Sequence, residues 1–446
     1  MTDSPDRRHS GFKRRTRLAQ ARDVLSDIVS VMDRTETVPL SKADGRVLGE
    51  RVRAKREVPH YPRAAMDGYA VRAPDTYGAS DRSPTVLTES DGPVEPGEAV
   101  RVHTGSEVPD GADAVVMIEH VETIGSDVEV RDAVAEGENV GPVGEDVERG
   151  TTLYRPGHRL RPSDLGLLKS VAVETVTVRK RPEVAVIPTG EEVVQADPDP
   201  GEIIETNGLT VSTLLRRWGG RPRYRDVVTD DKSALKRAIE RDLDADLVVT
   251  TGGSSVGARD LLPEVLDGLG EVLVHGVAIK PGHPVGFGHV EETPVLMLPG
   301  YPVSCIVNAF LFLRPAIADS LGTALIDPPT VEARLDAKIP SEPGVRTLAR
   351  VQLSENGSTD APGADVESED QIATPPIDRS QSTDAEADSP PEDATETTRI
   401  ATPVSASGAG VLSSVALSDG WVQVPESVEG IAAGELVTVE RWEAMA

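Results

Sequence analysis

The spacing of apolar residues changes along the chain, and it predicts a helix first and a β-rich part after it. Apolar residues recur at helical spacing from about Leu18 to Met32, which predicts an amphipathic helix. From about Arg56 to Val140, Gly and Pro separate short Val-rich stretches, a pattern typical of strands and turns. We therefore expect a small β domain between flanking segments.

A regular alternation of strands and helices begins at Pro182. The apolar runs predict strands at 184–187, 226–228 and 247–250, and the amphipathic stretches predict helices at 209–218, at 233–243 and from about 261. This order is typical of a parallel sheet with crossover helices. Ligands of such a domain bind at the carboxyl ends of the strands.

Short strands return from about Ile326, and the last is expected at Leu436–Glu440. Residues 355–399 interrupt them with 13 acidic residues, 2 arginines and almost no large apolar side chains. Such a segment buries too little surface to offset the entropy of ordering, so we expect disorder. No apolar stretch approaches the roughly 20 residues of a membrane helix, and nothing marks a signal peptide, so we expect a cytoplasmic protein with no membrane partner.

The composition adds a strong negative charge. The 446 residues include 46 Lys plus Arg and 75 Asp plus Glu, a formal net charge of −29. Sequence-independent binding to nucleic acid is excluded, because it needs clustered cations. Nine of the basic residues are lysines, and an acidic, lysine-poor composition is typical of halophilic proteins, whose self-repulsion is screened by salt. The single cysteine, Cys305, lies in an apolar run typical of a buried thiol.

The strongest local signal is an apolar strand that runs into a Gly- and Ser-rich turn at 252–257. Gly252 and Gly253 let backbone N–H groups face a phosphate, and Ser255 lies in the same turn. A carboxylate beside a phosphate-binding turn is a typical Mg²⁺ ligand, so Asp260 is the candidate metal ligand. A Gly-rich turn often merely connects two elements, so it is weak evidence alone.

Two further turns follow predicted strands, at 279–284 and 298–304. Because lysine is scarce, Lys280 in a turn fixed by Pro and Gly is the candidate oxyanion-binding cation, and an ordinary surface turn is the alternative. His283 is either a pH-dependent second cation or a plain loop residue. By pattern alone, the carboxylates in other irregular segments are more often surface groups than site groups; they include Asp67, Asp146 and Asp230.

Taken in order, these motifs resemble the molybdopterin molybdenumtransferase family, the molybdenum-insertion enzymes that include the E domain of gephyrin. The resemblance runs from about Leu18 to Trp442, without the acidic insert. The segments that carry it are 39–40 with 45–48, 65–70, 104–105 with 108–109, 144–146, 189–192, 206–207, 252–257, 280–282 and 299–304. Together and in this order they are highly specific.

The resemblance implies a multidomain α/β plus β fold. It comprises a central doubly wound α/β domain with a parallel-rich sheet, an inserted β domain, an elongated α+β dimerisation region and a C-terminal β-barrel. The expected boundaries are a flexible basic tail at 1–17, the dimerisation region at 18–58 and 141–180, the inserted β domain at 59–140, the α/β molybdopterin-binding domain at 181–325, and the barrel at 326–446 with the disordered insert at 355–399. A homodimer is implied, with the active site of the α/β domain facing the partner's inserted domain.

The activity implied by the resemblance is insertion of molybdate into adenylylated molybdopterin, with release of AMP and with a divalent cation, Mg²⁺. The partners are then a small pterin substrate, a metal oxyanion and the upstream adenylyltransferase. The implied catalytic residues are Asp67, Asp146, Glu192, Asp230, Asp260 and Lys280. The implied substrate-binding residues are Thr104, Gly252, Gly253, Ser255, His283, Pro299, Pro302 and Arg346, with Asp260 as the metal ligand.

Two residues depart from the family pattern. Many relatives carry a second lysine in place of His283 and an asparagine in place of Tyr301. A neutral imidazole removes one positive charge, so oxyanion affinity is lower or selectivity shifts, for example towards tungstate. A molybdopterin adenylyltransferase and a non-catalytic pterin-binding scaffold remain as alternatives. The inserted-domain and C-terminal motifs argue against the first, and Asp260 with Lys280 argues against the second.

Overall fold

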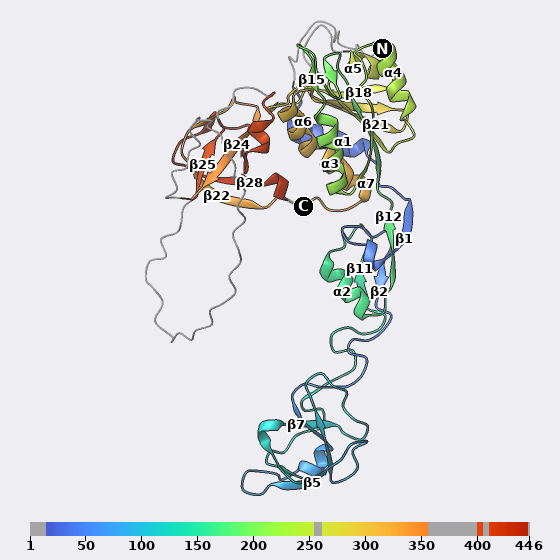
Figure 1. The fold of residues 1–446 in the computed structure, drawn as a ribbon, viewed down its shortest axis with the longest axis vertical. Coiled ribbons are helices and arrows are strands. Elements are labelled where there is room, and N and C mark those ends of the chain that lie inside the picture. The colour runs from blue at the N-terminus through green and yellow to red at the C-terminus, as the bar shows by residue number, and fades with distance from the viewer. Residues whose placement is uncertain (1–14, 254–260, 356–398, 405–409, 445–446) are drawn as a thin grey trace. The chain divides into compact units, whose positions relative to one another are not determined.

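The chain forms two compact units in its computed structural model, which describes residues 15–253, 261–355, 399–404 and 410–444 (Figure 1). Unit 1 comprises the described residues within 1–30, 182–317 and 325–446, and unit 2 comprises Val31–Arg181 and Ala318–Ala324. The acidic insert lies outside the described residues except at its two ends, so its expected disorder stays a prediction.

The central sheet of unit 1 has six strands in the order β16-β13-β17-β21-β20-β18. The first four run parallel, and β20 and β18 join antiparallel. Their bounds are β13 (Glu183–Pro188), β16 (Arg221–Tyr224), β17 (Leu247–Thr251), β18 (Glu271–His275), β20 (Gly286–Val290) and β21 (Thr293–Leu298). The sheet is therefore mixed, with the parallel strands that the alternation predicts.

The strand predicted at 226–228 is wrong, because the edge strand β16 lies upstream of it. The Arg-Pro-Arg-Tyr sequence of β16 has no apolar run. A strand at the edge of a sheet can form from such a sequence, because it need not be buried and it tolerates proline. Instead, Arg223 forms ion pairs with Glu183 of β13 and, at 2.8 Å, with Asp244. These ion pairs hold the strand in place, and apolar periodicity cannot detect them.

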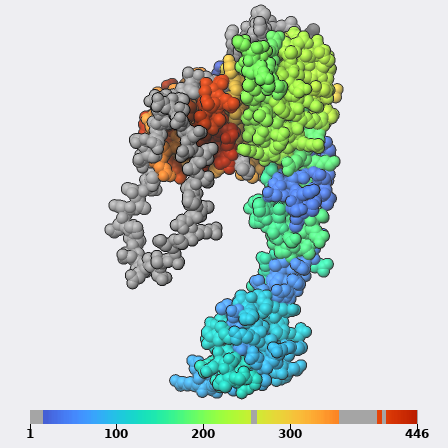
Figure 2. Space-filling view, in the orientation of Figure 1, coloured from blue at the N-terminus to red at the C-terminus, as the bar shows by residue number. Residues whose placement is uncertain are grey.

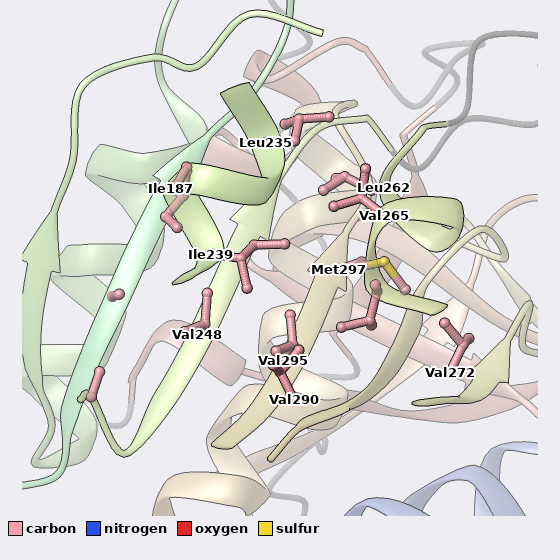
Figure 3. Close-up of a cluster of buried hydrophobic side chains, with 14 residues drawn as sticks. Ile187, Leu235, Ile239, Val248, Leu262, Val265, Val272, Val290, Val295 and Met297 are labelled. Carbon is pink, nitrogen blue, oxygen red and sulfur yellow. The ribbon is translucent and has the colours of Figure 1, made fainter. Parts of the chain in front are cut away.

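Helices cover both faces of this sheet (Figure 1). On one face, α4 and α5 bury Leu235, Ile239 and Leu262 against Val248 and Met297 of the strands (Figure 3). On the other face, α3 contacts β13 and α6 contacts β21. The helices of this part of unit 1 include α1 (Leu18–Ile28), α3 (Asn207–Trp218), α4 (Lys232–Arg241), α5 (Leu262–Leu269) and α6 (Pro302–Asn308).

Two helical segments differ from expectation. The first helix, α1, ends at Ile28 and not near Met32, because Val29 adopts an extended backbone. The helix Pro302–Leu321 combines α6, a π-helical turn (Ala309–Leu313) and α7 (Arg314–Leu321). It is long and apolar enough to cross a membrane, but 89% of its most apolar window is buried in the protein, as in a core helix. Cys305 is fully buried in it, and burial raises its thiol pKa, as a structural thiol requires.

A closed five-stranded barrel forms near the C-terminus of unit 1, as expected. The ring closes because β26 pairs with both β24 and β28. Apolar side chains, among them Val351 and Val439, fill its core. The barrel strands are β22 (Thr330–Leu335), β24 (Arg346–Ser354), β25 (Ile400–Pro403), β26 (Gly420–Val424) and β28 (Leu436–Glu440), and the short elements beside them are β23 (Ile339–Pro340), β27 (Gly430–Ile431), α8 (Ser413–Ala416) and η5 (Trp442–Ala444).

Strand pairing and aromatic packing both join the barrel to the α/β part of unit 1, whose surfaces adjoin in Figure 2. The short strand β19 (Ile279–Lys280) pairs in parallel with the start of β24. An aromatic cluster forms the second contact: Phe310 packs edge-on against Trp421 and Trp442, whose rings stack 5.1 Å apart. Only 3% of the residues of the chain are aromatic, so this contact brings together several of its few large apolar side chains.

Unit 2 contains a six-stranded sheet in the order β7-β4-β6-β5-β9-β8, in which β5 and β6 are parallel and the other neighbours antiparallel. Three two-stranded sheets, β1-β12, β2-β11 and β3-β10, and helix α2 (Pro162–Ser170) complete it. The strands are β1 (Thr35–Pro39), β2 (Val52–Arg53), β3 (Arg63–Ala64), β4 (Gly68–Val71), β5 (Thr85–Glu89), β6 (Glu98–Val102), β7 (Ala114–Met117), β8 (Val121–Ile124), β9 (Asp127–Val130), β10 (Val140–Gly141), β11 (Thr152–Tyr154) and β12 (Thr175–Arg179).

A buried carboxylate ties β11 to the first turn of α2. Asp164 is 2% exposed and accepts hydrogen bonds from Tyr154 Oη at 3.0 Å, His158 Nε2 at 2.8 Å and Arg161 Nη2 at 2.9 Å. Burial alone would raise the pKa of Asp164, but the bonds from Arg161, His158 and Tyr154 outweigh it and hold the pKa well below its usual range. The ionised carboxylate therefore stabilises this part of unit 2.

Replacing Trp421 tests the aromatic contact. We expect Trp421→Ala to lower the free energy of unfolding by about 3–5 kcal/mol, because it leaves a cavity against Phe310 and Trp442. Urea unfolding followed by far-UV circular dichroism measures the loss. The control is Trp218→Ala, at the partly exposed end of α3, which should cost less. Equal losses in the two variants would contradict the importance of the cluster.

Replacing Asp164 tests the buried carboxylate. Because folding lowers its pKa, its contribution is complete above the unfolded-state pKa of about 3.9 and is lost as the pH falls through the lower, folded value. We expect Asp164→Ala to destabilise α2 by about 3 kcal/mol at pH 7, and by less at pH 3. Amide hydrogen exchange of α2 measures both. Glu122→Ala, which breaks an exposed ion pair with Arg131, is the control; a difference independent of pH would count against the assignment.

Candidate functional site

Three neighbouring parallel strands, β13, β17 and β21, end at the same edge of the central sheet. Pro188 lies opposite Thr251, and Thr251 lies opposite Leu298. The backbone N–H of Gly252 donates to the carbonyl of Leu298 at 3.1 Å, so the next turn starts in contact with the neighbouring strand. The sheet therefore brings together two of the turns that the sequence singled out, after β17 and after β21.

The two glycines after β17 are required by close packing. Gly252 has φ +135°, and a Cβ there would lie 2.2 Å from the carbonyl oxygen of Thr189. Gly253 has φ +61°, and its Cβ would lie 2.8 Å from Cδ1 of Leu262. A side chain at Gly252 would force the ends of β13 and β17 apart, and one at Gly253 would collide with Leu262 of α5. Gly252 is buried and Gly253 is partly exposed, so close packing alone accounts for the two glycines, beside the functional reason predicted from the sequence.

Two threonine hydroxyls at this edge were missed by the sequence analysis. Thr189 and Thr251 are 2% and 3% exposed, and their Oγ1 atoms have no hydrogen-bond partner among the described residues. A buried hydroxyl left in this state costs about 1–3 kcal/mol, so a polar ligand or a water bound here would be stabilised. Thr189 directly follows the buried strand β13, and Thr251 ends the buried strand β17. This position at a strand end could have identified both threonines from the sequence.

Further predicted residues lie around the same edge. Val228, two residues before Asp230, donates to Pro188 O at 2.8 Å, which places the Asp230 segment beside the end of β13. Glu192 is exposed and follows β13 in a loop that includes β14 (Val193–Val194) and β15 (Ile203–Ile204). The prolines expected to shape the pocket flank the turn after β21, where Pro299 is buried and Pro302 begins α6.

The predicted metal ligand cannot be placed. Asp260 and Ser255 lie outside the described residues. Within the described ranges, no group of three or more His, Cys, Asp or Glu side chains could hold a metal ion.

Lys280 ends β19, directly before the turn that joins β19 to β20, and α6 holds that turn. The side-chain amide of Asn308, in α6, donates to the carbonyls of Gly282 at 2.9 Å and Ser304 at 2.8 Å. Lys280 Nζ lies 3.1 Å from Glu342 Oε1. His283 is partly buried, and burial lowers its imidazole pKa, so the ring is largely neutral at pH 7.

The barrel places two arginines differently on β24. Arg346, the predicted residue, donates from Nη2 to Glu426 Oε2 at 2.7 Å and from Nη1 to Gln423 Oε1 at 3.3 Å. Arg350 is partly buried, and its Nε and Nη1 have no hydrogen-bond partner among the described residues. Burial lowers the pKa of Arg350. An anion would pair more readily with Arg350, which the sequence analysis missed, than with Arg346.

In unit 2 the structure brings Asp67 and Thr104 together. The Asp67 carboxylate accepts hydrogen bonds from the backbone N–H of Thr104 at 2.6 Å and from its hydroxyl at 2.9 Å. These two bonds lower the pKa of Asp67, which keeps the exposed carboxylate ionised. Asp146 is also exposed, and its backbone N–H donates to Val58 O at 2.9 Å.

Models of known families match most of the chain. The model described as "MoeA N-terminal region (domain I and II)" matches residues 16–172. The model described as "Probable molybdopterin binding domain" matches residues 185–319, and "MoeA C-terminal region (domain IV)" matches residues 394–442. The three matches follow the order in which the sequence motifs occur.

Curated relatives and a solved structure agree with these models. The chain is 35% identical over 346 residues to molybdopterin molybdenumtransferase 2 of Mycobacterium tuberculosis, covering 72% of this chain and 84% of the relative. It is 35% identical over 303 residues to molybdopterin molybdenumtransferase of Bacillus subtilis, covering 64% and 70%. The crystal structure of the molybdopterin biosynthesis MoeA protein from Pyrococcus horikoshii matches with a TM-score of 0.75 and 31% identity over 96% of this chain and 100% of that one. The chain therefore belongs to the MoeA family of molybdopterin biosynthesis proteins.

Proposed function

We propose that this protein is a molybdopterin molybdenumtransferase, which inserts molybdate into adenylylated molybdopterin and releases AMP. The observation that carries the proposal is the shared edge of β13, β17 and β21, where a close-packed Gly-Gly turn lies beside two buried threonine hydroxyls that have no hydrogen-bond partner among the described residues. That edge lies within the part of the chain that matches the molybdopterin-binding model. Curated relatives of the chain are named for this activity.

Each group in the proposal has a separate task. The turn at Gly252 and Gly253 binds the phosphate part of the pterin substrate, with the hydroxyls of Thr189 and Thr251 beside it; the N–H of Gly252 pairs with Leu298 O and anchors that turn. Lys280 supplies a positive charge for molybdate, and Arg350 supplies another in place of the predicted Arg346. The carboxylates of Glu192 and Asp230 would orient the substrate's hydrogen-bond donors at the same edge, and Pro299 and Pro302 would fix the turn.

Magnesium remains part of the proposal through Asp260 alone. Mg²⁺ in phosphate-binding sites is commonly held by one or two carboxylates and by the substrate phosphates, so it needs no cage of protein ligands. The described residues supply no such cage. We therefore assign Asp260 as the expected ligand and route no step of the reaction through the ion.

The residues of unit 2 fit a second half of the site. We infer that Asp67, held ionised by Thr104, and Asp146 act at the active site of the partner subunit in a homodimer. The same proposal includes the five-part domain division of the chain and a cytoplasmic location. It also includes adaptation to high salt and contact with the upstream adenylyltransferase. The choice between molybdate and tungstate depends on the oxyanion-binding groups.

Release of AMP from adenylylated molybdopterin tests the function directly. With Mg²⁺ and molybdate we expect AMP release, and Lys280→Ala should raise the molybdate concentration needed for half-maximal release about tenfold, because a charge-assisted contact is lost. Repeating the assay with tungstate measures selectivity. No AMP with either oxyanion would favour a pterin-binding scaffold, and ATP consumption on bare molybdopterin would favour an adenylyltransferase.

Separate replacement of the two barrel arginines, Arg346 and Arg350, tests which one binds the oxyanion. We expect Arg350→Gln to raise the molybdate requirement about tenfold, because its guanidinium has no partner among the described residues. Arg346→Gln should mainly weaken the barrel, because it breaks the ion pair with Glu426. Arg334→Gln, on the exposed side of β22, is the control. A molybdate effect confined to Arg346→Gln would restore the assignment made from the sequence.

A further inference from the structure

The turn that carries Lys280 faces a second rigid turn, which carries a carboxylate. Residues 342–345 read Glu-Pro-Gly-Val, with the N–H of Val345 donating to Glu342 O at 3.1 Å and Gly344 at φ +82°. Proline at the second position and a positive φ at the third define a type II turn. The N–H of Gly344 also donates to Glu426 O at 2.8 Å. Glu342 is therefore held at a defined place on the barrel.

Strand pairing brings the two turns together. Parallel pairing of β19 with β24 sets Ile279 opposite Arg346 and Lys280 opposite Thr347, so the turn at 342–345, which leads into β24, enters the barrel next to β19. The result is the ion pair between Lys280 Nζ and Glu342 Oε1 at 3.1 Å. The pair joins the α/β part of the unit to the barrel, although the two side chains are 58% and 62% exposed.

Other basic groups lie near the same carboxylate. Thr16 donates to Gly276 O at 3.0 Å and accepts from Ala278 N at 2.8 Å, which fixes the preceding residue, Arg15, next to this turn. Arg15 and His283 both act on Glu342, whose pKa is lowered first by the hydrogen bond from Lys280 and then by its charge. Glu342 thus lies beside the positive charges of Lys280 and Arg15 and near His283, whose ring is largely neutral at pH 7.

We propose that Glu342 is a built-in competing anion, which sets the affinity of the Lys280 turn for a divalent oxyanion such as molybdate. The proposal rests on the oxyanion role of Lys280 in the proposed function. An incoming oxyanion must break the ion pair with Lys280 or bind beside a fixed negative charge, and either course weakens binding. An exposed pair is weak, so a divalent oxyanion can displace the carboxylate without a change of fold.

Direct binding of sodium molybdate, measured by isothermal titration calorimetry with the full chain, tests this role. We expect Glu342→Gln to bind molybdate about two- to fivefold more tightly than the wild type at low ionic strength, with a smaller gain at high salt. Gln keeps the turn, and an unchanged circular dichroism spectrum checks the fold. Lys280→Gln should weaken binding in both backgrounds.

Two control variants separate the ion pair from a general charge effect. Glu264→Gln breaks the ion pair between Glu264 and Lys232. These two side chains are 65% and 53% exposed, which is similar to the exposure of the pair between Lys280 and Glu342. Glu429→Gln removes an exposed charge from the loop whose backbone binds Ser341. Neither should change molybdate affinity. An equal gain in Glu429→Gln would overturn the specific role of Glu342.

The remaining outcomes distinguish the two proposals. Molybdate binding by the wild type with an equal or weaker affinity in Glu342→Gln would overturn the competing-anion role and leave the proposed function intact. Binding by neither protein would overturn it together with the oxyanion role of Lys280. AMP release by the wild type that persists in Lys280→Ala with an unchanged molybdate requirement would overturn that oxyanion role alone.

Discussion

The close approach of neighbouring strand ends is the constraint on which the candidate site depends. β13, β17 and β21 stop at one level, and the chain after β17 passes so near to Thr189 that a Cβ at Gly252 would lie 2.2 Å from its carbonyl oxygen. The apolar layer of α4 and α5 holds the strands in this register (Figure 3). The core thereby determines where backbone and hydroxyl groups meet a ligand.

The negative charge of the chain opposes the binding of anions, so an acidic protein that binds them must supply positive charge locally. The net charge is −29, and the cations of the site are scarce residues held by geometry. Lys280 is fixed by strand pairing and Arg346 by an ion pair, whereas Arg350 is held partly buried on β24. Because carboxylates accompany Lys280 and Arg346, the strength of anion binding depends on pairing as much as on the number of cations.

The sequence predicted the elements whose cause is local and apolar. The helices of the α/β part, the strands around 184 and 247, and the last strand follow from periodicity, and the family motifs predicted the barrel. Periodicity missed β16, which ion pairs hold, and the end of α1, which one extended residue sets. It also could not show that Arg346 pairs with Glu426 while Nε and Nη1 of Arg350 have no hydrogen-bond partner in the described part of the chain, because that difference depends on strands far apart in the chain.

The barrel has a further consequence through the pairing of β24 with β25. Ser354 lies directly opposite Ile400, so the chain leaves the barrel and returns to it at the same point. The ring of strands therefore sets no requirement on the length of chain that joins these two residues. Such a point accepts inserted sequence of very different size and composition, in evolution or by design, and a reporter domain could be grafted there without altering the register of the barrel.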